Sequence, residues 1–140
     1  MPNQPTTPPE YLFVYGSLMS GTKIPLGTAP RRTLRADAKL IGEGTIKAKL
    51  YNLGTYPGAV ASSQPGDTVW GEVWQLIDAH RVLAVIDRYE GIAAATPEYR
   101  RAAVTVTLLG ARDLTAWCYL YAHDVSRLSP VPDGRWPGQR

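Results

Sequence analysis

The stretch "YLFVYGSL", residues 11–18, joins an apolar run to an abrupt polar turn. Its unbroken apolar part, 11–15, predicts a short strand that is buried on both faces. The run ends at Gly16 and Ser17, and these residue types favour a turn with exposed backbone amides. Buried strands usually end in plain turn chemistry, whereas this one brings a backbone turn, a hydroxyl and an aromatic ring to one place, which raises the question of a further role.

The composition favours one folded domain between two proline-rich ends. The chain has 140 residues, of which 44% are hydrophobic, enough for a single core. Prolines are concentrated near both termini, so we expect residues 1–10 and 126–140 to be poorly ordered tails around a domain of about 11–125. This interpretation predicts that residues 1–9 and about 128–140 can be removed without loss of the fold; the alternative is that Trp136 packs back onto the domain or onto a partner.

The charge pattern argues against a nucleic-acid-binding protein. The net charge is +3, and the densest basic cluster is Arg31, Arg32 and Arg35, which favours a solvated face over a contact with phosphate or an acidic partner. The sequence has no apolar run of about 18 residues and no signal-peptide pattern, so we expect neither a membrane span nor secretion. We therefore expect a cytoplasmic protein, and the sequence leaves its oligomeric state open.

Cys118 is the single cysteine, so an internal disulfide is excluded. Its position inside the apolar run "AWCYLYA" favours a buried core residue over a reactive nucleophile. Together with His80 and His123 it offers too few ligands for a typical metal centre, and we predict no metal site.

Strand-like patterns recur further along the chain. The stretch 39–53 predicts two strands or one bent strand, because Gly42 and Gly44 favour a bulge or a sharp bend. Further strands are predicted at 69–76, 99–109 and 114–122. In the first of these, "VWGEVWQL", the period of two places on one face Trp70, Glu72, Trp74 and Leu76.

The segment "DAHRVLAVIDRYE", residues 78–90, has the period of a helix. Its apolar residues form one stripe, which consists of Val82, Leu83, Val85, Ile86 and Tyr89. Asp78 precedes the stripe and is a preferred N-cap residue.

Glu90 is the one acidic residue that the helical wheel places inside this stripe, between Leu83 and Ile86. Burial and the negative end of the helix dipole both favour the protonated form of such a carboxyl, as a general base or acid near neutral pH requires. The alternative is a last-turn side chain that swings into solvent. Glu72, between Trp70 and Trp74, is a rival base or a structural acid bonded to a neighbouring strand.

Several motifs occur in the order found in one enzyme family. They are "VYGSL" (14–18), "LYNLGTYPGAV" (50–60), "GEVWQL" (71–76), "IDRYEG" (86–91), "YRRAAVTV" (99–106) and "AWCYLY" (116–121). With this set, residues 11–122 resemble the gamma-glutamylcyclotransferase-like superfamily, which includes AIG2-like proteins. The resemblance implies an α+β fold, a small mixed β-barrel of six or seven strands with one main flanking helix and a cavity at the end of the first strand.

The resemblance also implies an activity. Active members convert a γ-glutamyl amine or γ-glutamyl peptide to 5-oxoproline and a free amine, without a cofactor. The family's glutamate corresponds to Glu90, as general base and acid, and its substrate loop corresponds to Tyr15, Gly16, Ser17 and Leu18. Ser17 is then a binding hydroxyl, since "YGSLM" lacks the G-x-S-x-G spacing of a hydrolase nucleophile.

The tyrosines of this pattern have structural alternatives. The resemblance places Tyr121 near the glutamate, although it also fits an ordinary barrel aromatic, on one face with Trp117 and Tyr119. Tyr15 fits a wall of the cavity or a core residue. Tyr56, Pro57 and Gly58 fit the cavity rim or simple packing.

The stretch "MSGTKIPLGTAPRR", 19–32, departs from the basic or glycine-rich segment usual in the family, so the substrate stays open. Two other functions also stay open. One is a cavity that binds a small acid or amine without turnover. The other is an interaction protein that uses the arginine cluster or the proline-rich ends.

Overall fold

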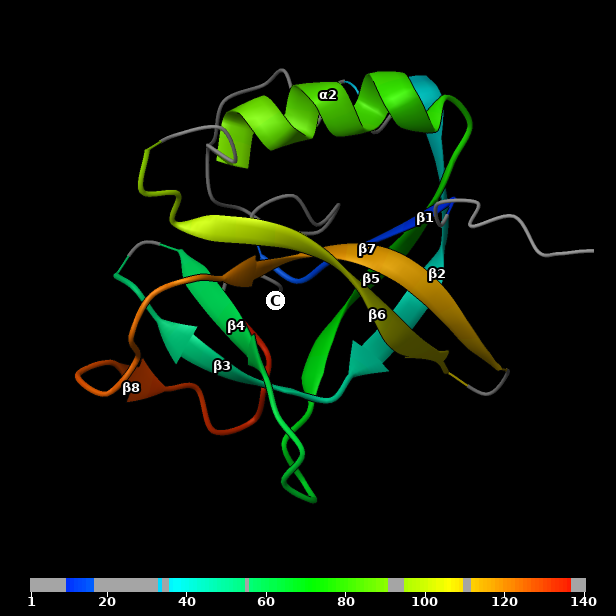
Figure 1. Ribbon diagram of the computed structural model, residues 1–140. Helices are drawn as coiled ribbons and strands as arrows, with labels where there is room; N and C mark the ends of the chain where they lie inside the picture. The colour runs from blue at the N-terminus through cyan, green and yellow to red at the C-terminus, as the bar shows by residue number, and fades with distance from the viewer. Residues whose placement is uncertain are drawn as a thin grey trace, which may run out of the picture.

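The computed structural model describes residues 10–16, 33, 36–54, 56–90, 95–109 and 112–136, and at 89 and 90 the backbone alone. The elements, in chain order, are β1 (Tyr11–Val14), β2 (Ala38–Ile46), β3 (Ala48–Asn52), β4 (Pro57–Ala61), β5 (Val69–Leu76), α2 (Ala79–Glu90), β6 (Tyr99–Leu108), β7 (Asp113–Tyr121) and β8 (Ser129–Pro130). A closed barrel has the strand order β1-β5-β2-β6-β7, and a separate sheet has the order β4-β3-β8. Helix α2 lies across the top of the barrel in Figure 1, and the smaller sheet lies at the lower left.

The predicted fold class is confirmed: the barrel is mixed, and one long helix flanks it. Strand β1 runs parallel to β7, with Leu12 opposite Trp117, and antiparallel to β5. The described strands divide between a five-stranded barrel and a three-stranded sheet. This division begins at Lys47, because Ile46 still pairs with β5 whereas Ala48 already pairs with β4. The stretch 39–53 therefore forms two strands, and the expected bulge lies between Leu40 and Gly42.

Three barrel strands, β1, β5 and β7, have apolar residues on both faces, as the sequence of β1 predicted. One face packs into a core inside the barrel, which includes Phe13, Val73, Cys118 and Leu120. The opposite face packs against helix α2 through Leu12, Val14, Trp74 and Tyr119. Cys118 is fully buried, which confirms it as a core residue.

Helix α2 is capped and buried as its sequence predicts. The Asp78 carboxylate accepts a hydrogen bond from the Arg81 backbone N–H at 3.2 Å. Val82 and Ile86, on the face of the helix that packs against the barrel, are fully buried. Within the described ranges, no helix has the length and apolar character that crossing a membrane requires.

The C-terminal segment corrects the expectation of a loose, removable tail. Strand β8 pairs with β3, the Trp70 N–H donates to the Gly134 carbonyl at 2.9 Å, and the Trp136 side chain is only 4% exposed. Of the two alternatives for Trp136, the structure shows the first: its side chain packs back onto the domain. Residues 129–136 thus belong to the folded unit, whereas residues 1–9 and 137–140 lie outside the described ranges.

Candidate active site

Tyr15 joins the end of β1 to two other strands. Its side chain is buried, and its hydroxyl donates to the Tyr119 carbonyl on β7 at 2.6 Å. The same oxygen accepts a hydrogen bond from the Ala59 N–H on β4 at 3.1 Å. These contacts favour the packing alternative for Tyr15, and they fix where the chain leaves the barrel at Gly16.

Two glycines allow the ends of β1 and β7 to approach the start of β4. A Cβ atom on Gly16 would lie 2.8 Å from Cγ of Pro57, and one on Gly58 would lie 2.9 Å from Cβ of Tyr121. Such distances are too short for a real side chain, so both positions require glycine. Tyr15, Gly16 and Tyr121, three of the predicted site residues, therefore meet around the first residues of β4.

Aromatic and polar side chains surround this meeting point. The Tyr121 ring packs edge-on against Tyr99, with ring centroids 5.9 Å apart, and against His123 at 5.7 Å. The Tyr99 hydroxyl donates to the Pro57 carbonyl at 2.6 Å. The set forms an aromatic wall that is tied to the strand carrying Pro57 and Gly58.

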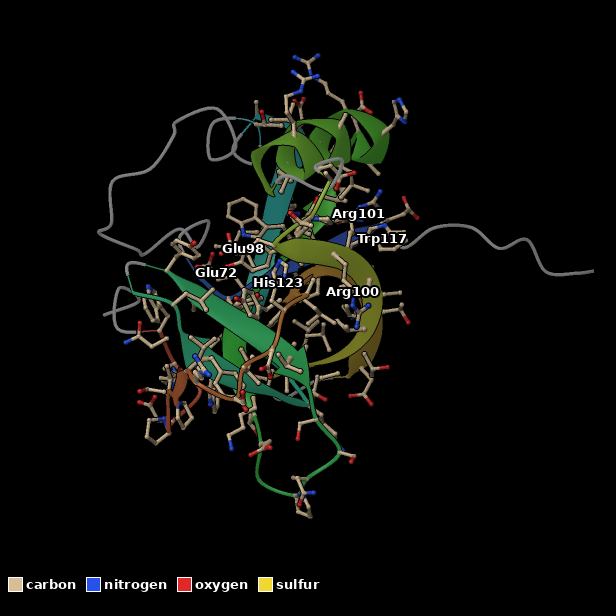
Figure 2. The ribbon with its side chains drawn as sticks, turned by 60° about the vertical axis from the view of Figure 1, so that its left-hand side comes forward. Glu72, Glu98, Arg100, Arg101, Trp117 and His123 are labelled. Atoms are coloured by element: carbon tan, nitrogen blue, oxygen red, sulfur yellow. The ribbon has the colours of Figure 1, made fainter. Side chains whose placement is uncertain are left out.

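A carboxylate also lies beside this aromatic wall. The Tyr56 hydroxyl donates to Oε2 of Glu98 at 2.8 Å, just before β6 begins. Figure 2 draws Glu72, Glu98 and His123 on one side of the molecule, between helix α2 and the smaller sheet. Glu98 was not among the residues that the sequence singled out, because it lies outside every strand and helix pattern.

The remaining predicted site residues lie at or beyond the edge of the description. Glu90 is the last residue of helix α2, and its side chain lies outside the described residues. Ser17 and Leu18 also lie outside them, as does the arginine cluster at 31, 32 and 35. Their roles stay predictions.

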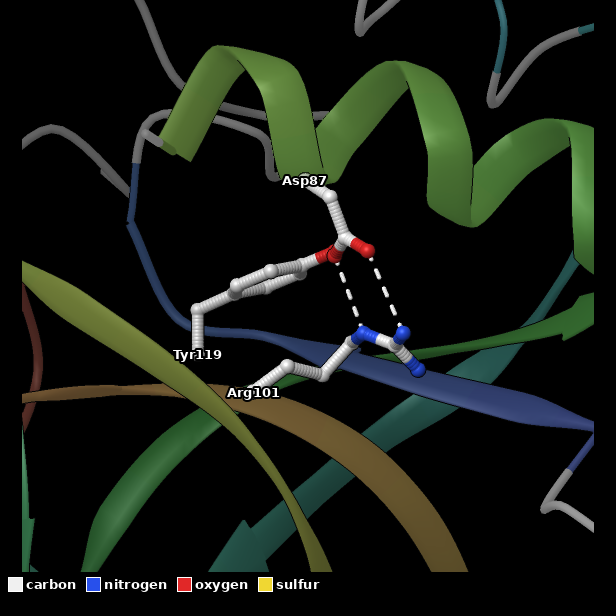
Figure 3. Close-up of polar contacts among 3 residues, drawn as sticks. All are labelled: Asp87, Arg101 and Tyr119. Carbon is white, nitrogen blue, oxygen red and sulfur yellow. Dashed lines mark hydrogen bonds and ion pairs between the residues drawn. The ribbon is translucent and has the colours of Figure 1, made fainter. Parts of the chain in front are cut away.

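One helical turn before Glu90, Asp87 is bound by two strands of the barrel. Its carboxylate accepts hydrogen bonds from the Arg101 guanidinium, at 2.9 and 3.1 Å, and from the Tyr119 hydroxyl, at 2.5 Å. Figure 3 draws these three side chains together. Arg101 also lies over the Trp117 ring, with its Cζ atom 4.4 Å from the ring centroid, beneath helix α2 in Figure 2. The last turn of the helix is therefore fixed to both β6 and β7.

The sequence missed this cluster for a specific reason. The wheel places Asp87 outside the apolar stripe, which is typical of a solvated side chain. The only sequence signal for Asp87 was its position three residues before Glu90. The only sequence signal for Tyr119 was its place on the same strand face as Tyr121. The three residues of this cluster lie on three separate elements. They come together only when the helix packs on the barrel, and a local sequence pattern does not contain that information.

Glu72, the rival acid, lies near the end of β1. It is half-buried on β5 opposite Val14, and its Oε1 accepts a hydrogen bond from Nε1 of Trp74 at 3.3 Å. This contact is on its own strand, and it is not the bond to a neighbouring strand that the structural alternative predicted. Because Glu72 lies beside the end of β1, it is the control residue for the assignment of Glu90 as the base.

A separate pocket of about 570 Å³ opens where β2 passes into β3. Its polar lining consists of Thr45, Lys47, Thr68, Thr105, Thr107 and Asp113. It contains none of the predicted site residues, so it is distinct from the meeting point around β4.

Comparison with known proteins gives the family. Residues 12–138 match the model of the family described as gamma-glutamyl cyclotransferase, AIG2-like. The gamma-glutamylcyclotransferase family protein YtfP of Escherichia coli K12 is 35% identical over 127 residues, which cover 89% of this chain and 94% of that protein. The protein of the same name from Citrobacter rodentium is 36% identical over 127 residues, with 89% and 93% covered.

Solved structures agree with this result. The solution structure of ytfP from Escherichia coli has a TM-score of 0.61 and 32% identity, and covers 91% of this chain and 96% of that one. The crystal structure of an AIG2-like protein from Mus musculus has a TM-score of 0.68 over 90% and 88% of the two chains; at 20% identity it supports the fold alone. From the family match and these relatives, the chain belongs to the AIG2-like gamma-glutamyl cyclotransferase family.

Proposed function

We propose that the protein is a cyclotransferase that converts a γ-glutamyl amine or γ-glutamyl peptide to 5-oxoproline and the free amine. Its family supports the reaction class. The observation that carries the proposal to particular residues is a pair of hydrogen bonds made by Tyr119. Its hydroxyl donates to Asp87, one turn before Glu90, and its backbone carbonyl accepts from Tyr15, the residue that precedes Gly16.

The reaction needs little beyond a held conformation and one proton carrier. The α-amine of the γ-glutamyl group attacks its own γ-carbonyl carbon, and a new C–N bond closes a five-membered ring. Glu90 takes a proton from the attacking nitrogen and gives it to the leaving nitrogen as the original amide C–N bond breaks. Atoms balance without water, because the leaving amine keeps the proton that the α-amine lost. Holding the reacting atoms together supplies a large part of such a rate enhancement.

The loop that begins at Gly16 supplies the anion-binding part of this proposal. Backbone N–H groups at 16–18 are suited to the substrate carboxylate and to the oxyanion that develops on the γ-carbonyl. Gly16 touches Pro57, so the loop starts against the aromatic wall formed by Tyr99 and Tyr121. We assign Ser17 a binding hydroxyl, and we assign Tyr121 to the wall beside the γ-glutamyl chain.

Release of 5-oxoproline from a panel of γ-glutamyl compounds tests the proposal. The panel joins the γ-glutamyl group to a neutral amino acid, to the side-chain amine of lysine, and to a simple alkylamine. We expect 5-oxoproline and the free amine in equal amounts from at least one compound. Binding of these compounds without release of 5-oxoproline would identify the binding-module alternative and would refute the enzyme.

A further inference from the structure

We propose that Tyr119 is a positioning residue that sets the last turn of helix α2, and with it Glu90, relative to the end of β1 at Gly16. The inference rests on the proposed function, because the role of Glu90 in turnover comes from there. Tyr119 does not touch the reacting atoms in this account. It acts through two other residues, one on each side of the site.

Tyr119 uses two different polar groups at once. Its backbone carbonyl accepts the hydrogen bond from Tyr15 at 2.6 Å, and its hydroxyl donates to Asp87 at 2.5 Å. Tyr119 is only 4% exposed; its bond with Tyr15 is buried and its bond with Asp87 is partly buried. A single buried residue on β7 therefore joins the end of β1 to the end of the helix.

Arg101 makes this connection directional. It binds both carboxylate oxygens of Asp87, so the carboxylate plane is fixed by a two-point contact. Arg101 itself lies over the Trp117 ring. Its charge also offsets the negative charge of Asp87, which the helix C-terminus disfavours.

The anchor acts at the turn that carries the proposed base. Asp87 and Glu90 are three residues apart, so they lie on neighbouring positions of the helix surface. Apolar contacts of Val82 and Ile86 hold the helix on the barrel, but such contacts are non-directional. The bonds of Asp87 fix the rotation and the height of the last turn. A displacement of about 1 Å at a reacting group costs up to about a hundredfold in rate.

The helix offers a matched control at its other end. Asp37, the residue before β2, forms an ion pair with Arg81 at 3.3 Å and so contacts helix α2 in its first turn. Arg81 and Glu90 are nine residues apart, which is about 13 Å along a helix. Asp37→Asn therefore removes the same kind of contact without loosening the last turn.

The first measurement compares steady-state rates on a compound that the wild type turns over. We expect Tyr119→Phe and Asp87→Asn each to lower kcat roughly tenfold to a hundredfold, with KM within about twofold. Asp37→Asn is expected to stay within about twofold of the wild type in both constants. Tyr119→Phe keeps the ring and the carbonyl bond to Tyr15, so the barrel core is preserved. Equal losses in Asp37→Asn and Asp87→Asn would overturn the proposal, since any helix contact would then matter alike.

A double variant tests whether Tyr119 acts through Glu90. In the Glu90→Gln background, Tyr119→Phe is expected to cause no further loss, because there is no base left to position. Two losses that multiply would show that Tyr119 acts elsewhere and would refute the positioning role.

Amide hydrogen exchange gives a readout that does not depend on turnover. Tyr119→Phe and Asp87→Asn should speed exchange of the amides at 87–90 at least about fivefold, with those at 83–85 unchanged. Unchanged exchange at 87–90 would overturn the inference even if the enzyme is active. If no γ-glutamyl compound is turned over, the proposed function fails, whereas selective loosening of the last turn would still establish the anchor.

Discussion

At the scale of single residues, Gly16 illustrates how a missing side chain positions the site. The Pro57 ring, which a Cβ at this position would meet at 2.8 Å, cannot move aside as a flexible side chain would. We expect Gly16→Ala to destabilise the fold by roughly 1–3 kcal/mol and to lower 5-oxoproline release. Thermal unfolding and the release assay measure the two effects.

The double variant Gly16→Ala/Pro57→Ala is the test of cause. Pro57→Ala removes Cγ and Cδ, the two atoms that the new methyl group would meet at 2.8 and 3.0 Å. The double variant should therefore be more stable than the sum of the single losses predicts. Strict additivity would show that the close approach is not the reason for glycine at this position.

The residue scale also shows where sequence reasoning ends. The motif and the helical wheel both select Glu90, and strand alternation placed Tyr121 and Tyr119 on one face, which the packing of both tyrosines against the helix-facing core confirms. Asp87 looked like a solvated residue, because its partners come from β6 and β7 and not from its own helix. Contacts between side chains on different elements depend on how those elements pack together. The local periodicity of a sequence does not predict that packing.

At the scale of elements, helix α2 depends on a capped start as well as on its apolar face. The Asp78 carboxylate satisfies the Arg81 N–H, one of the amides that an α-helix leaves unpaired at its first turn. We expect Asp78→Ala to reduce the free energy of unfolding by about 0.5–2 kcal/mol, as measured by denaturant titration. Asp78→Ser should recover most of that loss, and no difference between Ala and Ser would contradict the cap.

Elements with a strong internal period were predictable, and the others were not. Strand β1 is apolar throughout because both of its faces are buried. Strand β5 alternates because its two faces contribute to two different cores. The break between β2 and β3 was foreseen only as two strands or a bend, since the residue at the break, Lys47, is unremarkable in composition. Strand β8 spans only Ser129–Pro130, which is too short to have a period.

At the scale of the whole molecule, the C-terminal segment packs against the barrel. Trp136 joins the inner core, and Arg135 lies over the Trp70 ring at 3.9 Å while it pairs with Glu43 at 3.2 Å. We expect Trp136→Ala to cost about 3–5 kcal/mol of unfolding free energy. A chain that stops at residue 128 should lose at least as much, and its melting temperature should fall accordingly.

A chain that ends at Trp136 is the matched control for that truncation. It retains β8 and the buried indole, so we expect it to melt with the full-length protein. If the chain ending at 128 melted at the same temperature as well, the packing of residues 129–136 would contribute nothing to stability, and the original expectation of a removable tail would stand.

The central claim is that the carboxylate of Glu90 carries the proton during cyclisation. The most direct measurement is the rate of 5-oxoproline release by the wild type, Glu90→Gln and Glu72→Gln on one γ-glutamyl compound, with binding of an uncleavable analogue measured in parallel. The account predicts a fall of roughly two to four powers of ten in Glu90→Gln with binding retained, and near-normal turnover in Glu72→Gln. Full activity in Glu90→Gln would contradict it, and loss in Glu72→Gln alone would move the base to strand β5.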